Sequence, residues 1–148
     1  MRAASLDSHA SVLAHHLYQA GGVADTTRTA RVLLLAGKQA LGSGAFEETV
    51  QLSDHVFSLE LGEQDPLLGE ASQQHGEALA GLQRYDDAVV ALKRNTKLQP
   101  MSPYGWYQLA RVHAERHAPD EAVKIIRHLK GFEPKVAAQL ERETGLVA

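Results

Sequence analysis

Three pairs of adjacent carboxylates are the first candidates for chemistry in this chain of 148 residues. They are Glu47-Glu48, Asp86-Asp87 and Asp120-Glu121, and two neighbouring carboxylates can act as a general acid and a general base. All three are followed by Ala or Thr and then by Val, which favours the first turn of a helix. Since the helix dipole stabilises negative charge there, we interpret the pairs as helix starts rather than as catalytic groups.

The eight histidines offer a second possible chemistry. His113 and His117 are four residues apart, so on one helix they would lie close enough to share a metal ion. No nearby carboxylate completes a ligand set, and the HExxH motif of zinc proteases is absent. We therefore expect His113 to pack between helices and His117 to lie in a turn, with no metal site.

Other catalytic and cofactor signatures are missing from the sequence. Gly42-Ser43-Gly44 lacks the following Lys-Ser/Thr of a phosphate-binding loop, and we predict a turn between helices there. The absence of cysteine excludes a thiol nucleophile and a disulfide framework. The sequence gives no argument for an enzyme, and we expect no cofactor.

The acidic pairs also recur at a regular spacing. Asp86-Asp87-Ala88-Val89 returns later in the chain as Asp120-Glu121-Ala122-Val123, and Glu47-Glu48-Thr49-Val50 precedes it at a slightly longer distance. Pro100 and Pro134 are separated by the same interval as Asp86 and Asp120. A period of about 34 residues lies in the range that marks a repeat architecture. In such an architecture each unit buries its apolar face only against its neighbours.

The period and the residues at fixed offsets resemble the tetratricopeptide repeat, a helix–turn–helix unit. Residues 103–136 carry its pattern as Trp106, Leu109-Ala110, His113, Ala122, Ile126 and Pro134. Residues 69–102 carry it as Ser72, His75-Gly76, Leu79, Ala88, Leu92 and Pro100, and residues 30–63 more weakly as Leu33, Ala36-Gly37, Ala40, Thr49 and Ser53. His75 takes a position that leucine usually fills, so we expect it to be partly buried.

The residue types at these positions also make physical sense on their own. Ala88 and Ala122 are small, which suits a place where two helices cross closely. Asp65-Pro66 and Ser102-Pro103 each look like an N-cap followed by the first helical residue, and Pro119 fits the same first position. We predict helices near residues 7–20, 25–42, 45–61, 66–81, 85–98, 103–117, 119–130 and 135–144.

These patterns predict an all-α protein, an α-solenoid of antiparallel helix pairs with seven or eight helices. We expect one tetratricopeptide-like domain over residues 1–148. Within it, residues 1–29 would form an N-terminal helix or degenerate half-repeat. Repeats would follow at 30–68, 69–102 and 103–136, and a capping helix at 137–148 would present a polar face to water.

In the tetratricopeptide family the first helix of each repeat lines a concave groove that binds a peptide or a partner helix. Carried over residue by residue, the resemblance implies a groove formed by Leu34, Lys38, Leu41, Gln73, Glu77, Tyr104, Tyr107, Gln108 and Arg111. Tyr and Arg are frequent in binding hot spots, and their chemistry here suits an acidic, partly apolar segment. Alternatively, Tyr104 or Tyr107 packs against the neighbouring unit.

One subset of the family grips the C-termini of heat-shock chaperones with Lys and Asn side chains. Here Leu34, Lys38 and Gln74 or Glu77 stand at those places, which argues against a receptor for chaperone tails. A formal net charge of −3 gives no reason to expect nucleic-acid binding. No apolar run approaches the length of a membrane span.

We therefore expect a non-catalytic protein–protein interaction module that binds an extended or helical protein segment in its concave groove. His and Asp residues interrupt the N-terminal apolar stretch, so a secretory signal is not expected, and we predict a cytoplasmic protein. Two alternatives stay open: a small cytoplasmic chaperone for a secreted client, or a regulatory or targeting domain of a longer enzyme. The sequence makes no prediction of oligomeric state.

Overall fold

The computed structural model describes residues 25–148, and this part of the chain consists of seven α-helices and no strand. The helices are α2 (Thr26–Gly42), α3 (Phe46–Phe57), α4 (Pro66–Gly81), α5 (Tyr85–Leu98), α6 (Pro103–Glu115), α7 (Pro119–Lys130) and α8 (Pro134–Thr144). The helix predicted near residues 7–20 lies outside the described residues. The predicted all-α class of antiparallel helix pairs is confirmed.

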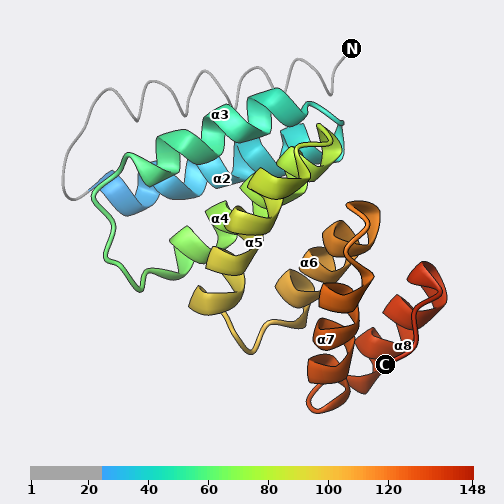
Figure 1. Ribbon diagram of the computed structural model, residues 1–148. Helices are drawn as coiled ribbons and strands as arrows, with labels where there is room; N and C mark the ends of the chain where they lie inside the picture. Colours follow the sequence, from blue (N-terminus) through green and yellow to red (C-terminus); the bar gives the residue numbers. More distant parts are fainter. Residues whose placement is uncertain (1–24) are drawn as a thin grey trace.

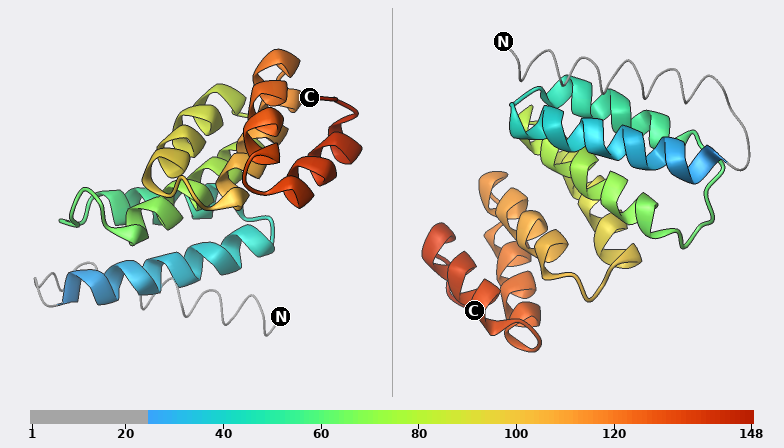
Figure 2. Two further views of the ribbon diagram at one scale, coloured as in Figure 1. Left: turned by 90° about the horizontal axis from the view of Figure 1, so that it is seen from below. Right: turned by 180° about the vertical axis from the view of Figure 1, so that it is seen from behind.

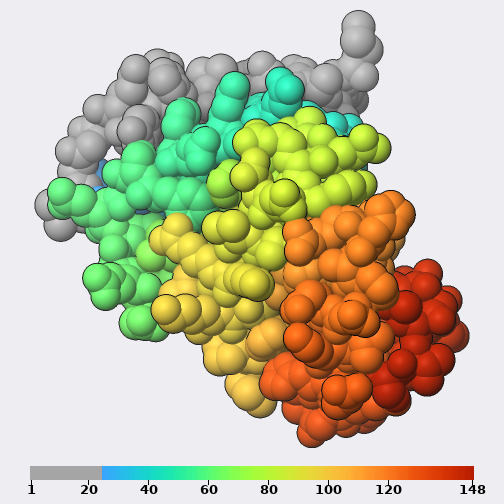
Figure 3. Space-filling view, viewed as in Figure 1, coloured from blue at the N-terminus to red at the C-terminus, as the bar shows by residue number. Residues whose placement is uncertain are grey.

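The helices stack in chain order along the molecule. Figure 1 shows α2 and α3 at one end, α4 and α5 in the middle, and α6, α7 and α8 at the other end. Each helix packs against the next, and α2 also contacts α4, α4 contacts α6, and α6 contacts α8. The two further views in Figure 2 show the same progression, and Figure 3 shows the units packed closely side by side along one face. The even-numbered helices therefore form a continuous inner layer, as expected for a helical repeat.

Two helix ends differ from the prediction. Helix α3 ends at Phe57 rather than near residue 61, because the Ser58 hydroxyl donates to the carbonyl of His55 at 2.6 Å and the chain then turns away. Leu59 and Leu61 leave the helix and pack against the apolar core of the first pair. Helix α6 ends at Glu115 because His117 takes a left-handed backbone conformation.

The turns within the three helix pairs share one backbone conformation. Gly44, Gln83 and His117 have φ angles of 79°, 62° and 64°, and they follow one another at the same intervals as the three acidic pairs. The next residue in each turn donates its N–H to a carbonyl five residues earlier, at 2.8 Å in all three cases. This is the bond that closes a helix in a Schellman motif. The left-handed backbone conformation therefore recurs in all three turns, although only the first of them has glycine at that position.

Small residues stand where the paired helices cross, as predicted. Ala88 and Ala122 are completely buried. At Gly76 of α4, a Cβ would lie 2.5 Å from Leu92 of α5, so only glycine fits at that distance. Of the two predicted N-caps, Asp65 accepts the Leu67 N–H at 2.9 Å, whereas the Ser102 side chain makes no such bond to the described backbone.

The apolar core divides into two clusters. One joins α2, α3 and the start of α4 around Leu33, Leu52 and Val56. The other runs from Leu79 in α4 to Leu140 in α8. Buried amide side chains help to join the units: Gln74 of α4 donates to the carbonyl of Leu34 in α2 at 3.0 Å. Within residues 25–148, every helix is too short or too polar to cross a membrane.

Candidate functional site

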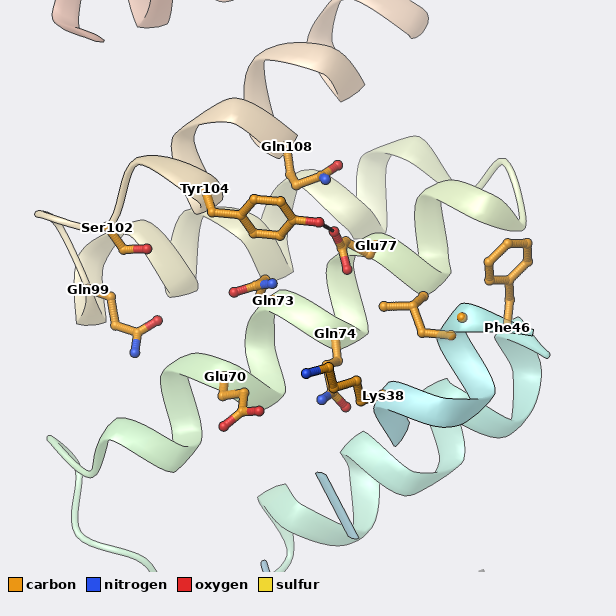
Figure 4. Close-up of a pocket in the computed structure, with 12 residues that line it drawn as sticks. Lys38, Phe46, Glu70, Gln73, Gln74, Glu77, Gln99, Ser102, Tyr104 and Gln108 are labelled. Atoms are coloured by element: carbon orange, nitrogen blue, oxygen red, sulfur yellow. Dashed lines mark hydrogen bonds between the residues drawn. The ribbon is translucent and has the colours of Figure 1, made fainter. Parts of the chain in front are cut away.

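A hollow of about 860 Å³ lies over the inner layer of helices. Helices α2, α4 and α6 each contribute side chains to it, and the connection between α5 and α6 adds Gln99 and Ser102. Figure 4 shows these side chains turned toward a common space. The lining residues are Lys38, Leu41, Gly42, Phe46, Glu70, Gln73, Gln74, Glu77, Gln99, Ser102, Tyr104 and Gln108. We call this hollow the groove.

Six of the nine predicted groove residues line it. They are Lys38 and Leu41 on α2, Gln73 and Glu77 on α4, and Tyr104 and Gln108 on α6. Each pair is spaced by three or four residues, so both members lie on one face of their helix. Three successive units therefore present their side chains to one space.

The prediction that Leu34 lines the groove is wrong. Its side chain is 3% exposed and packs in the core of the first helix pair. The reason is the close approach of α4, whose Gln74 bonds the Leu34 carbonyl. Gln74 fits because residue 37 is glycine: a Cβ there would lie 2.2 Å from the amide oxygen of Gln74.

Tyr107 and Arg111 lie beside the groove and face α8 instead. The Tyr107 hydroxyl donates to Oε1 of Glu143 at 2.8 Å, and Nη1 of Arg111 donates to the same hydroxyl at 3.3 Å. Tyr107 therefore packs against the neighbouring element, which was the alternative interpretation of these tyrosines. A smaller cavity of about 190 Å³ lies there, and Tyr104 borders both cavities.

Tyr104 on α6 reaches across the groove to α4. It is 44% exposed, and its hydroxyl donates to the Glu77 carboxylate on α4, the bond drawn in Figure 4. Burial raises the pKa of Glu77, although the hydrogen bond from Tyr104 opposes this shift. Burial and the same carboxylate raise the pKa of Tyr104 to about 12. The ring is thus held in place while part of its surface is open to a ligand.

Several groove residues were missed from the sequence. Glu70 precedes Gln73 by three residues and Glu77 by seven, so the helical spacing could have revealed it. Gln99 and Ser102 come from the end of α5 and the following connection, where no helical period applies. Phe46 begins α3, an outer helix of its pair, and only the packing of α3 near Gly81 of α4 brings its ring to the groove.

The groove is rich in amides and poor in positive charge. Its described lining contains Gln73, Gln74, Gln99 and Gln108, with Lys38 as its cation and Glu70 and Glu77 as its carboxylates. An amide side chain both donates and accepts hydrogen bonds, which suits the N–H and C=O groups of a peptide backbone. The excess of carboxylates does not favour the acidic segment expected from Tyr107 and Arg111.

The residues considered for catalysis or metal binding lie in helix first turns, in turns between helices or in the packing between helices. The acidic pairs lie in the first turns of α3, α5 and α7. His113 is 2% exposed, His117 lies in a turn, and His75 is half-buried with its Nε2 3.8 Å from Asp54. Among residues 25–148, no three His, Cys, Asp or Glu side chains are grouped to hold a metal ion.

No protein-family model matches the chain, and no curated protein matches its sequence. Among solved structures, that of MamA MSR-1 C2 is similar, with a TM-score of 0.57 and 19% sequence identity. The similarity covers 91% of this chain and 69% of that one. The described chain has a tetratricopeptide-like helical-repeat fold. At 19% identity the likeness is one of fold.

Proposed function

We propose that this chain is a non-catalytic protein-interaction module whose groove binds an extended or helical segment of a partner protein. The observation that carries the proposal is the shared lining: three successive inner helices contribute Lys38, Gln73 and Tyr104 to one space of about 860 Å³. The small rotation between successive repeats curves a solenoid, and solenoid proteins use the resulting concave surface for binding.

The side chains of the groove suggest how a segment is held. The partly exposed amides of Gln73 and Gln108 can bond the backbone of a peptide that crosses from α2 to α6, which gives affinity without strict sequence preference. Tyr104 supplies the large, partly exposed surface typical of an anchor residue. With Lys38 set against Glu70 and Glu77, the charge favours a neutral or basic segment.

The proposal excludes catalysis because the candidate chemical groups have other roles. Each acidic pair lies where a helix dipole stabilises negative charge. The buried His113 does not line the groove.

The test compares three proteins immobilised under the same conditions: wild type, a groove variant (Gln73→Ala with Tyr104→Ala) and a control (Arg127→Glu, exposed on α7). Proteins captured from native lysate are identified by mass spectrometry, and a peptide from the captured protein is then titrated by calorimetry. Loss of an anchor costs about 2 kcal/mol, so the groove variant should bind roughly thirtyfold more weakly.

Circular dichroism and thermal melting must show that all three proteins fold alike. The proposal is wrong if the groove variant binds the peptide as tightly as wild type does, or if only Arg127→Glu loses it. Recovery of the partner as a soluble but unfolded full-length protein would support the chaperone alternative instead.

A further inference from the structure

A second cavity, of about 410 Å³, opens between α5, α6 and α7. It is formed by the outer helices of the second and third pairs together with the buried face of α6, so it lies apart from the groove. Its lining residues are Lys93, Thr96, Lys97, Trp106, Leu109, His113, Glu121, Lys124 and Ile125. We call it the α5–α7 cleft. A volume of this size is in the range of ligand pockets, roughly 300–1,000 Å³.

The floor of the α5–α7 cleft is apolar. Leu109 and Ile125 belong to the larger core cluster, and Trp106 packs against it. The Trp106 indole N–H donates to the carbonyl of Pro100 at 2.9 Å, and its ring centroid lies 4.5 Å from that of His128. The indole is therefore fixed in orientation while one part of it borders the cleft.

The rim of the cleft is positively charged. Lys93, Lys97 and Lys124 are exposed and come from two helices, α5 and α7. The carboxylate among the described lining residues is Glu121, and it already accepts a hydrogen bond from Lys124 at 3.2 Å. The rim thus carries an excess of positive charge around an apolar floor.

A buried histidine completes the wall. His113 is 2% exposed, and its Nδ1 has no hydrogen-bond partner among the described residues. Burial, Arg116 and Lys93 lower the pKa of His113, against an opposing effect of Glu121, so the ring is neutral near pH 7. An unpaired buried polar atom costs stability, and most buried polar atoms are paired for that reason.

The same place in the preceding unit provides an internal comparison. A cleft of about 500 Å³ opens there between α3, α4 and α5. In its lining, Leu79 stands one repeat before His113, and Val90 stands one repeat before Lys124. The repeat therefore explains the presence of a cleft, but it does not require a histidine in the wall or lysines on the rim.

The charges of the earlier cleft are also matched within it. Arg84 pairs with Asp87 at 2.8 Å. Asp54, which stands one repeat before Lys93, lies 3.8 Å from Nε2 of His75. Arg94 lies over the Phe57 ring, 4.7 Å from its centroid. Of the two equivalent clefts, the α5–α7 cleft is therefore the one with an excess of positive charge.

We propose that the α5–α7 cleft binds an acidic segment of a partner protein, which inserts one large apolar side chain onto the Trp106 floor. Carboxylates on either side of that side chain pair with Lys93, Lys97 and Lys124. The apolar floor favours a segment that carries an apolar side chain over one that offers charge alone, since ligand pockets are lined mainly by apolar groups with a few polar ones. The site is separate from the groove and does not depend on the function proposed for it.

Trp106 makes the proposal directly measurable, because it is the only tryptophan in the chain. The full chain is titrated with an acidic heptapeptide, Asp-Glu-Asp-Leu-Glu-Asp-Glu, and indole fluorescence is recorded. The comparison peptides replace the central Leu by Ser, or all six acids by Lys. We expect a saturable change with the first peptide, weakened by added salt, and none with the other two.

Two variants with equal change in net charge test the site. Lys93→Glu with Lys124→Glu should weaken binding of the acidic peptide at least about tenfold, by the loss of charge pairing. Arg84→Glu with Arg94→Glu alters the earlier cleft by the same four charges and should leave binding unchanged. His113→Leu places at this position the leucine of the earlier cleft, and it should keep or raise the melting temperature because it removes an unpaired buried nitrogen.

The proposal is overturned if both double variants weaken binding equally, since that would indicate long-range attraction rather than a site. It is also overturned if the peptide gives no saturable change up to about 1 mM. Tighter binding of a single-stranded thymidine oligonucleotide than of the acidic peptide would assign the lysines to nucleic acid instead.

Discussion

The side-chain oxygen of Asn95 on α5 occupies the space that a side chain on Gly105 of α6 would need. Oδ1 lies 1.8 Å from the ideal Cβ position of residue 105. The other end of the same amide donates to the carbonyl of Gly69 on α4 at 2.7 Å. Asn95 is buried, so a single amide links three helices and sets the distance between the second and third units.

The substitution Gly105→Ala should therefore lower the free energy of unfolding by about 1–3 kcal/mol, the usual cost of overpacking. Urea denaturation followed by circular dichroism measures the change. In an Asn95→Ala background, where the obstructing amide is gone, the same substitution should cost less than about 0.5 kcal/mol. Equal costs in both backgrounds would contradict the contact, because coupled residues give non-additive effects.

The substitution Ala122→Asp should destabilise the protein by several kcal/mol, since it places a carboxylate at a completely buried helix crossing. Thermal melting is the measurement. The matched control is Arg127→Asp on the exposed side of the same helix, which should stay within about 0.5 kcal/mol of wild type. A normal melting temperature for Ala122→Asp would mean that α6 and α7 do not pack as described.

The substitutions Gln83→Gly and His117→Gly should each stabilise the protein by about 0.5–1 kcal/mol, because both residues have positive φ angles. A positive φ angle has a steric cost for a non-glycine residue, whereas glycine loses the larger conformational entropy of its unfolded chain. The steric cost is the larger of the two. Conversely, Gly44→Ala should lower stability, because Gly44 has a φ of 79° in the equivalent turn. Lower melting temperatures for both glycine variants would show that these side chains contribute contacts that outweigh the backbone cost.

Stability should fall as the pH drops below about 6.5, the ordinary pKa of histidine. Burial lowers the pKa values of His75 and His113 from 6.5 in the folded chain, so the unfolded chain takes up protons first. Proton uptake therefore favours unfolding below the unfolded pKa and has no effect above it. Melting temperatures at pH 7.5 and 5.5 measure the loss.

The matched control for this pH effect is the variant His75→Leu with His113→Leu. Leucine stands at the equivalent place of the other repeat in both cases, as Leu109 for His75 and as Leu79 for His113. The melting temperature of this variant should fall less between pH 7.5 and 5.5 than that of wild type. An equal fall would assign the pH dependence to other groups.

Removal of divalent metal ions should not change the melting temperature of the protein. His113 is buried and His117 lies in a turn, so the two rings do not form a shared ligand pair with a third group among residues 25–148. Thermal melting with and without a chelator should give the same midpoint, and Zn²⁺ should not bind stoichiometrically. A tight one-to-one zinc complex that His113→Ala with His117→Ala abolishes would refute this.

The fold was predictable because its signals are local in the sequence. The acidic first turns, Asp65 before Pro66, and the alanines at the crossings depend on residues within one helix pair, and their recurrence identifies the repeat. The end of α3 was not predictable, because no glycine or proline marks it. Ser58 and the packing of Leu59 and Leu61 decide it instead.

The groove was predictable only in part, for a physical reason. Helical spacing assigns Leu34 and Lys38 to one face of α2, yet the contact of Gln74 with that face buries Leu34 and leaves Lys38 exposed. Likewise, the spacing puts Tyr107 and Arg111 together, but Tyr107 bonds Glu143 on α8 and Arg111 bonds the Tyr107 hydroxyl, so neither side chain lines the groove.

The sequence by itself thus determined the helices, their pairing and the faces on which residues lie. The tertiary structure decided which of those faces meet. It brings Gln99 to the groove and sets Lys93 of α5 opposite Lys124 of α7 around Trp106. The distance between units depends on buried side chains: Gln74 bonds the Leu34 carbonyl of the preceding unit, and Asn95 contacts Gly105 of the following one. The sequence pattern of a single helix pair contains neither contact.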